Sequence, residues 1–195
     1  MVRAVKRSVL VAMAALSLFT CHAQQAIAPV DGQKASYTTS ESFTCVTGDV
    51  AVITGSSTKK IRVTHVEFSV ITTGTAAKEV YTIVKRSTLD SGGTSASMTV
   101  IQHDSNDASP TATLTYYTVA PTSSGSAVGT VQYFNIWEST PGSTLGSIPP
   151  IVSLFGTEPG TKALVLNNAN ENLTLNLNAA TATATCSVVI RWTEE

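Results

Sequence analysis

The stretch from Lys78 to Thr118 most constrains the fold, because it reads as short strands joined by polar turns and shows no helical periodicity. Three runs in it carry the β-branched and aromatic residues typical of strands: Lys78–Lys85, Met98–Gln102 and Ala112–Val119. Between them, Asp90-Ser91-Gly92-Gly93 predicts a hairpin-like turn, and the Asx- and Pro-rich residues 104–110 predict a loop. A chain organised around such a stretch is mainly β.

The rest of the chain repeats this pattern of short apolar runs and turn residues. Further strands are expected at Phe43–Ile53 (one bulged strand or two), Lys60–Ile71, Val128–Trp137, Ile151–Phe155, Ala163–Leu166, Leu173–Leu177 and Ser187–Trp192. The apolar phase flips near His65, which indicates a β-bulge or a strand covered on both faces. We therefore expect an all-β chain, a single antiparallel β-sandwich or jelly roll of roughly eight to ten short strands, with minimal helix apart from an N-terminal leader.

Composition bounds the function. Of 195 residues, 13% are charged and the net charge is −1, so the chain lacks the basic field that collects nucleic acid. Apolar residues make up 43%, which is enough for a packed core and excludes a disordered chain. One domain is the simplest expectation for this length.

The N-terminus resembles a signal peptide. A positively charged start precedes the apolar run Ser8–Phe19, which is too short to span a bilayer. We expect cleavage between Ala23 and Gln24, with lipidation of Cys21 as the alternative. The expected boundaries are a leader at residues 1–23, a polar arm at 24–41 and the β-sandwich at 42–195, so contact with a membrane is expected only through the leader.

Cleavage after Ala23 leaves two cysteines, Cys45 and Cys186, near the two ends of the domain. The first and last strands of antiparallel sandwiches often lie side by side, so we expect a disulfide between these residues in an exported protein. Two unrelated buried thiols are the alternative.

Several patches in the same order resemble small structural proteins of tailed bacteriophages. They are KRSTLDSGGTS at Lys85–Ser95, the segment Gln102–Val131, FGTEPGTKALVLNNANENLTLNLN at Phe155–Asn178, and VVIRWTEE at Val188–Glu195. The resemblance implies a β-sandwich in the virion or associated with the capsid. It carries no catalytic residues over to this chain.

His103, Asp104, Asn106 and Asp107 bring one imidazole and several oxygen ligands together, so they are the metal-site candidates. Calcium takes six to eight oxygens and usually uses a Gly turn with a distal Glu, both of which are missing here. Asx-turn chemistry is therefore the favoured interpretation. His65 and Glu67 share one strand face as a second polar pair, favoured as structural.

Three aromatic residues are candidates for a sugar-binding face: Tyr117, Tyr133 and Trp137. They fall on two strands that follow each other in the sequence, and ring stacking is their proposed role; core packing is the competing interpretation.

No nucleophile elbow, phosphate loop or zinc spacing is present in the sequence. We therefore expect a protein that is not an enzyme and needs no cofactor. Its expected role is a structural or assembly module of the virion type, with copies of itself or other virion proteins as partners. The alternative is an exported periplasmic or cell-surface β-sandwich that binds a glycan or a protein.

Overall fold

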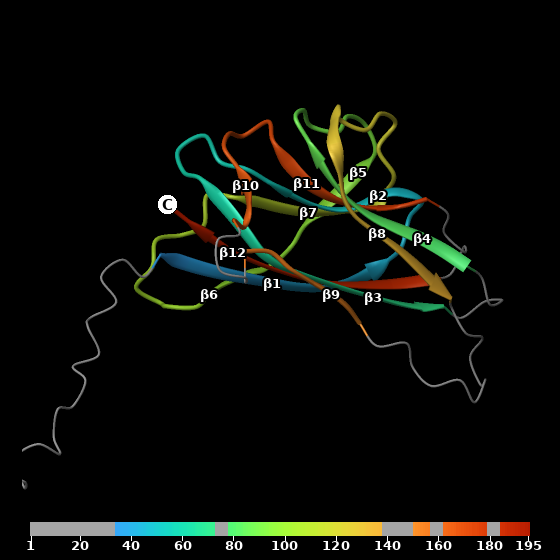
Figure 1. Cartoon of the computed structure of the whole chain (residues 1–195), viewed down its shortest axis with the longest axis horizontal. Helices are drawn as coiled ribbons and strands as arrows, with labels where there is room; N and C mark the ends of the chain where they lie inside the picture. Colours follow the sequence, from blue (N-terminus) through green and yellow to red (C-terminus); the bar gives the residue numbers. More distant parts are fainter. Residues whose placement is uncertain (1–33, 73–77, 138–149, 157–161, 179–183) are drawn as a thin grey trace, which may run out of the picture. The chain divides into compact units, whose positions relative to one another are not determined.

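The computed structural model describes residues 34–72, 78–137, 150–156, 162–178 and 184–195. These residues form no helix, and hence none that could cross a membrane. They form twelve strands, against the eight to ten expected (Figure 1): β1 (Ala35–Thr44), β2 (Gly48–Thr54), β3 (Ile61–Thr72), β4 (Lys78–Arg86), β5 (Thr94–Ser97), β6 (Val100–Gln102), β7 (Thr113–Val119), β8 (Ala127–Trp137), β9 (Ile151–Leu154), β10 (Leu164–Leu166), β11 (Asn172–Leu177) and β12 (Ala184–Glu194).

The strands form two antiparallel six-stranded sheets packed face to face, which confirms the predicted β-sandwich (Figure 1). Sheet A has the order β10-β3-β12-β1-β6, and β9 also pairs with β3. Sheet B has the order β5-β7-β2-β11-β4-β8. The described strands at three of the four sheet margins are only three or four residues long, whereas β8 has 11 residues.

Strand β1 corrects the predicted polar arm. It begins at Ala35, inside the predicted arm at residues 24–41, and pairs along its length with β12. Although its sequence is rich in hydroxyl residues, buried and more exposed side chains alternate along it, and Tyr37 and Thr39 face the core. Burial of Thr39 is tolerated because its hydroxyl donates a hydrogen bond to the Thr99 carbonyl at 2.7 Å. Strand β1 is therefore an interior strand of sheet A, between β12 and β6, rather than an extended arm.

The bulge predicted near His65 is present in β3. Arg191 of β12 lies opposite His65, but the next residue, Trp192, lies opposite Val63, so Thr64 is the extra residue. The shift explains the flip in phase, because Val63 and Val66 can then both reach the core.

The stretch from Lys78 to Thr118 differs from the simple meander that its turns suggest. Strand β4 pairs with β11 and β8, while β5 pairs with β7, so the Asp90–Gly93 turn does not close a hairpin. The predicted strand Met98–Gln102 is also divided. Met98 still donates its backbone N–H to Leu114 of sheet B, whereas β6 pairs with β1 of sheet A. The chain crosses between the sheets at this point.

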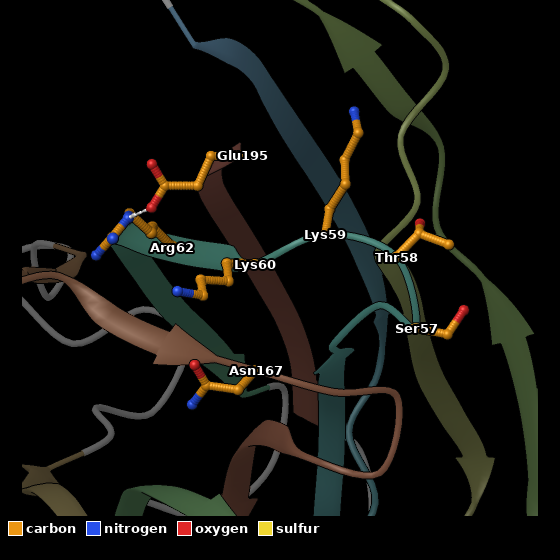
Figure 2. A pocket seen from close by; sticks show the side chains of 7 residues that line it. All are labelled: Ser57, Thr58, Lys59, Lys60, Arg62, Asn167 and Glu195. Carbon is orange, nitrogen blue, oxygen red and sulfur yellow. Dashed lines mark hydrogen bonds and ion pairs between the residues drawn. The ribbon is translucent and has the colours of Figure 1, made fainter.

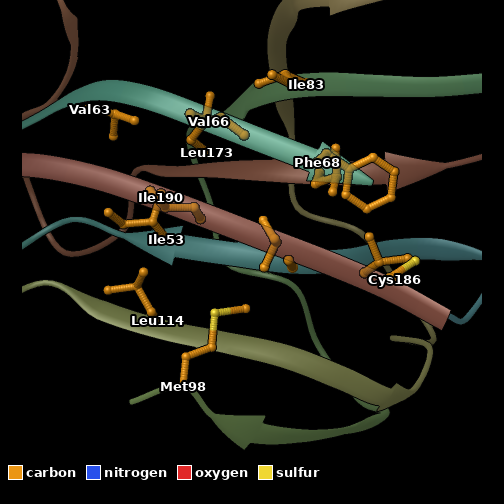
Figure 3. Packing of buried hydrophobic residues seen from close by; sticks show 14 of the residues in the cluster. Ile53, Val63, Val66, Phe68, Ile83, Met98, Leu114, Leu173, Cys186 and Ile190 are labelled. Carbon is orange, nitrogen blue, oxygen red and sulfur yellow. The ribbon is translucent and has the colours of Figure 1, made fainter. Parts of the chain in front are cut away.

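Apolar residues of both sheets fill the interior (Figure 3). Ring pairs lie along it, with Tyr37 stacked on Trp192 at 5.4 Å between centroids and Phe43 on Tyr116 at 4.7 Å. Trp192 of β12 is a buried core residue. A void of about 10 Å³ between the sheets holds at most one water, so it is no ligand cavity.

The predicted disulfide is present. Cys45 directly follows β1, and Cys186 lies on β12 with an S–S distance of 2.04 Å. The Cys45 N–H also donates to the Ala184 carbonyl at 2.9 Å, which continues the pairing of β1 with β12. The bridge therefore ties together the first and last strands of sheet A.

Candidate functional site

The metal candidates lie in the loop between β6 and β7. Both ring nitrogens of His103 contact hydroxyls of β1: Nδ1 lies 3.0 Å from Ser36 Oγ, and Nε2 lies 2.5 Å from Thr38 Oγ1. Asp104 Oδ1 accepts hydrogen bonds from the backbone and side-chain N–H groups of Asn106, which is an Asx turn. Within the described residues, no group of three or more His, Cys, Asp or Glu side chains is placed to hold a metal ion.

The same loop is fastened to β1. Asp107 Oδ2 accepts a hydrogen bond from the Ser36 N–H at 3.3 Å, and the Tyr37 hydroxyl donates to the Ala108 carbonyl at 2.7 Å. The side chains predicted as ligands therefore hold a loop in place against sheet A.

The candidate aromatic residues do not share neighbouring strands. Tyr117 lies on β7 and Tyr133 on β8, and β2, β11 and β4 lie between these strands in the order of sheet B. The Tyr117 hydroxyl donates to Asp90 Oδ2 at 3.1 Å, whereas the Tyr133 side chain is 58% exposed. Trp137 ends β8, and its side chain is outside the described part of the structure. The three residues were expected to lie close together because their strands follow each other in the sequence. In sheet B, however, consecutive strands of the chain are not neighbours, so Tyr117 and Tyr133 lie on separate parts of the sheet.

A buried ion pair on sheet B was not predicted. Asp49 of β2 is fully buried, and its Oδ1 accepts hydrogen bonds from Arg86 Nη2 at 2.8 Å and from Asn176 Nδ2 at 2.7 Å. Asp49 Oδ2 and Arg86 Nε have no hydrogen-bond partner among the described residues. These side chains come from three adjacent strands, and they face away from the core leucines of β11.

Asp90 joins this cluster from the turn after β4. Its Oδ1 accepts a hydrogen bond from the Gly125 N–H at 2.8 Å, while Arg86 Nη1 donates to the Gly125 carbonyl at 2.7 Å. Burial, together with the negative charge of Asp49, raises the pKa of Asp90 despite these contacts. Burial and the charge of Asp90 likewise raise the pKa of the Tyr117 phenol. These contacts hold the connection between β4 and β5 and the connection between β7 and β8 against sheet B.

Two further sequence patterns are structural. His65 Nε2 and Glu67 Oε2 lie 3.4 Å apart on β3, so this pair does form. Asn172, within an Asn-Leu-Thr glycosylation sequon, is 1% exposed, and its amide contacts the Thr88 carbonyl and the Thr174 hydroxyl. A buried and hydrogen-bonded amide cannot accept a glycan in the folded protein.

A polar pocket of about 590 Å³ lies at one end of the sandwich, near the end of β12 (Figure 2). It is formed by the connection between β2 and β3, the start of β3, the residue after β10 and the residue after β12. Its lining residues are Ser57, Thr58, Lys59, Lys60, Arg62, Asn167 and Glu195. Backbone hydrogen bonds between Lys60 and Glu195 fix the two segments against each other.

Cations dominate this pocket. The Glu195 carboxylate is held by Arg62 and by Lys34, whose hydrogen bonds lower the pKa of Glu195. Lys59 Nζ lies 3.6 Å from the buried Glu194 carboxylate. The residues were not predicted as a site, because their only sequence signal is the short basic run Lys59-Lys60-Ile61-Arg62.

Strand β8 presents a different kind of site, a free sheet edge. Among the described strands it pairs with β4 alone, and none of its 11 residues is charged. Register shifts leave Val128 and Val131 as extra residues, and both are exposed. From Gln132 to Trp137 the pairing with β4 is regular, so the opposite edge offers a straight row of backbone donors and acceptors.

Comparisons with family models, curated proteins and solved structures found no match for this chain. The resemblance to structural proteins of tailed bacteriophages thus remains a prediction from the sequence. The cleavage site at Ala23 and Gln24 and the alternative lipid site at Cys21 lie outside the described residues.

Proposed function

We propose that this chain is a non-enzymatic assembly module of the virion type, a disulfide-bonded β-sandwich that joins copies of itself through the free edge of β8. The observation that carries the proposal is the contrast between the margins of the two sheets. Soluble proteins protect edge strands by keeping them short or charged, by proline, or by β-bulges. Strand β8 has two bulges, at Val128 and Val131, and its regular edge is the run Gln132–Trp137. Strand β8 is long and uncharged and contains no proline, whereas the other margins carry strands of three or four residues.

A second copy suits this edge. Two β8 strands can pair antiparallel about a twofold axis, which places the same surface on both sides of the contact. Because β8 has no charged residue, such pairing brings no like charges together. The exposed Tyr133 ring would lie beside the new strand, where aromatic side chains commonly stabilise interfaces.

Sedimentation velocity over a wide range of protein concentration tests the proposal. The wild-type domain should associate reversibly, and Tyr133→Lys should weaken association by at least about tenfold, because a lysine on an edge strand opposes pairing. The matched control is Ser95→Lys on β5, the exposed short edge of the same sheet, which should leave association unchanged. A wild-type domain that stays monomeric at every concentration, or equal effects of both variants, would contradict the proposal.

The alternative is an exported cell-surface or periplasmic module that binds a glycan or a protein. The disulfide favours an oxidising setting, which fits exported proteins and also the surface of virions. Mass spectrometry of the mature N-terminus separates these settings. A chain that retains Met1 in purified particles supports the virion module, a chain that starts at Gln24 supports export, and a diacylated Cys21 establishes a lipoprotein.

A further inference from the structure

The basic pocket contains a cation that no other described group neutralises. Arg62 is engaged by Glu195, and Lys59 lies near Glu194. The Lys60 ammonium makes no hydrogen bond or ion pair with the described residues, and Figure 2 shows its side chain extending to the same side as those of Arg62 and Asn167. A ligand that supplies a negative charge between these groups would neutralise it.

The pocket already shows that it can hold a carboxylate. The Glu195 side chain is bound by Arg62 and Lys34, and both Arg62 and Glu195 remain partly exposed, with relative side-chain exposures of 29% and 26%. An oxyanion from outside can therefore reach the guanidinium and compete with Glu195. Guanidinium groups bind carboxylates, and tetrahedral oxyanions such as phosphates, well because two of their N–H donors can contact two oxygens at once.

We propose that this pocket binds a small acidic sugar unit through its carboxylate or sulfate group, with Lys60 and Arg62 contacting the anion. The neutral polar side chains of Ser57, Thr58 and Asn167 line the rest of the pocket and offer hydrogen-bond partners to sugar hydroxyls. The pocket, of about 590 Å³, is an open surface depression in which Ser57, Thr58, Lys60 and Asn167 are exposed, so a ligand can enter it directly from solvent. No aromatic ring is among the residues that line it, so charge rather than ring stacking selects the ligand.

The binding test is a nuclear magnetic resonance titration of the ¹⁵N-labelled protein at constant ionic strength. The probes are glucuronate, N-acetylglucosamine 6-sulfate, inorganic phosphate and glucose. At least one of the two acidic sugars should shift the amides of Ser57–Lys60, Asn167 and Glu195, and glucose should not. Which acidic sugar binds distinguishes a carboxylate from a sulfate. Shifts with phosphate alone, equal shifts with glucose, or no shifts with either acidic sugar would overturn the proposal.

Two variants with opposite expected effects test the assigned contacts. Lys60→Met should weaken binding of the acidic sugar about tenfold, because a charge-assisted hydrogen bond is lost. The matched control Lys162→Met removes an exposed lysine outside the pocket lining and should leave affinity unchanged.

Glu195→Gln should strengthen binding several-fold, because it releases Arg62 from its internal partner. Its control, Glu41→Gln on β1, changes the net charge equally without touching the pocket. Equal effects of either variant and its control would show a nonspecific response to charge and would refute the site.

Discussion

At the scale of residues, a few buried polar side chains fix the ends of strands and loops. Glu194, 3% exposed, accepts hydrogen bonds from the backbone N–H groups of Thr111 and Ala112, from the Thr111 hydroxyl and from Trp192 Nε1. Burial acts to raise the pKa of Glu194, but these hydrogen bonds outweigh it and hold the pKa below its ordinary value. The carboxylate thus fastens the segment before β7 to the end of β12.

The first prediction concerns Glu194 and pH. Since its folded-state pKa is lower than in the unfolded chain, the ionised carboxylate stabilises the fold above about pH 4.5, and this stability is lost as the pH falls through the folded-state pKa. Glu194→Gln should lower the free energy of unfolding by about 1–3 kcal/mol at pH 7. Urea unfolding of both proteins should show this difference shrinking toward pH 3. A difference that is constant with pH would count against the role assigned to the carboxylate.

The second prediction concerns the buried ion pair. Arg86→Met should cost about 3–5 kcal/mol, because it leaves the fully buried carboxylate of Asp49 without its cation. Adding Asp49→Asn should recover part of this loss of stability, since burying a neutral amide costs less free energy than burying an unpaired carboxylate. Chemical denaturation of the two single variants and the double variant measures the coupling. Strictly additive losses would be inconsistent with a direct interaction.

Sequence patterns predicted contacts between residues that are close in the chain, but not contacts between residues that are far apart in it. The Asx turn at Asp104 could be predicted because Asn106, its partner, is two residues away. The Asp49–Arg86 pair joins residues 37 positions apart, and Asp49 and Asn176 are 127 apart, so only the strand order brings them together. Neither spacing carries a recognisable motif.

At the scale of elements, the apolar pattern of the sequence predicted where most strands lie. It did not predict which strands pair with each other. The bulge near His65 was predictable because an odd residue reverses the alternation. The beginning of β1 was missed because its buried positions include Thr39, whose hydroxyl is satisfied only by the distant Thr99 carbonyl. The turn at Asp90–Gly93 has the glycines of a hairpin, but its neighbours pair with other strands.

The third prediction concerns the link between β1 and β12. Cys45→Ser and Cys186→Ser should each destabilise the domain, by equal amounts of about 2–4 kcal/mol, because either change opens a bridge between residues 141 positions apart. The double variant should lose little more than either single variant. Thermal unfolding of the three variants provides the measurement, and additive losses in the double variant would argue against a shared bridge.

At the scale of the whole molecule, the described residues form a sandwich with one continuous core, and β8 is the only one of its described sheet margins longer than four residues. The void of about 10 Å³ between the sheets is too small for a ligand, whereas the pocket at Lys60 opens to the surface. The pocket at Lys60 and the edge at β8 involve different segments, so small-ligand binding and self-association can be tested separately.

Hydrogen exchange at several protein concentrations tests the central claim, assembly through β8, most directly. Pairing of two β8 strands would bury the edge-facing amides of the regular run Gln132–Trp137. We predict that exchange in this run slows as concentration rises, while exchange in the short edge strand β5 stays constant. Exchange rates in β8 that are the same at every concentration would contradict the account.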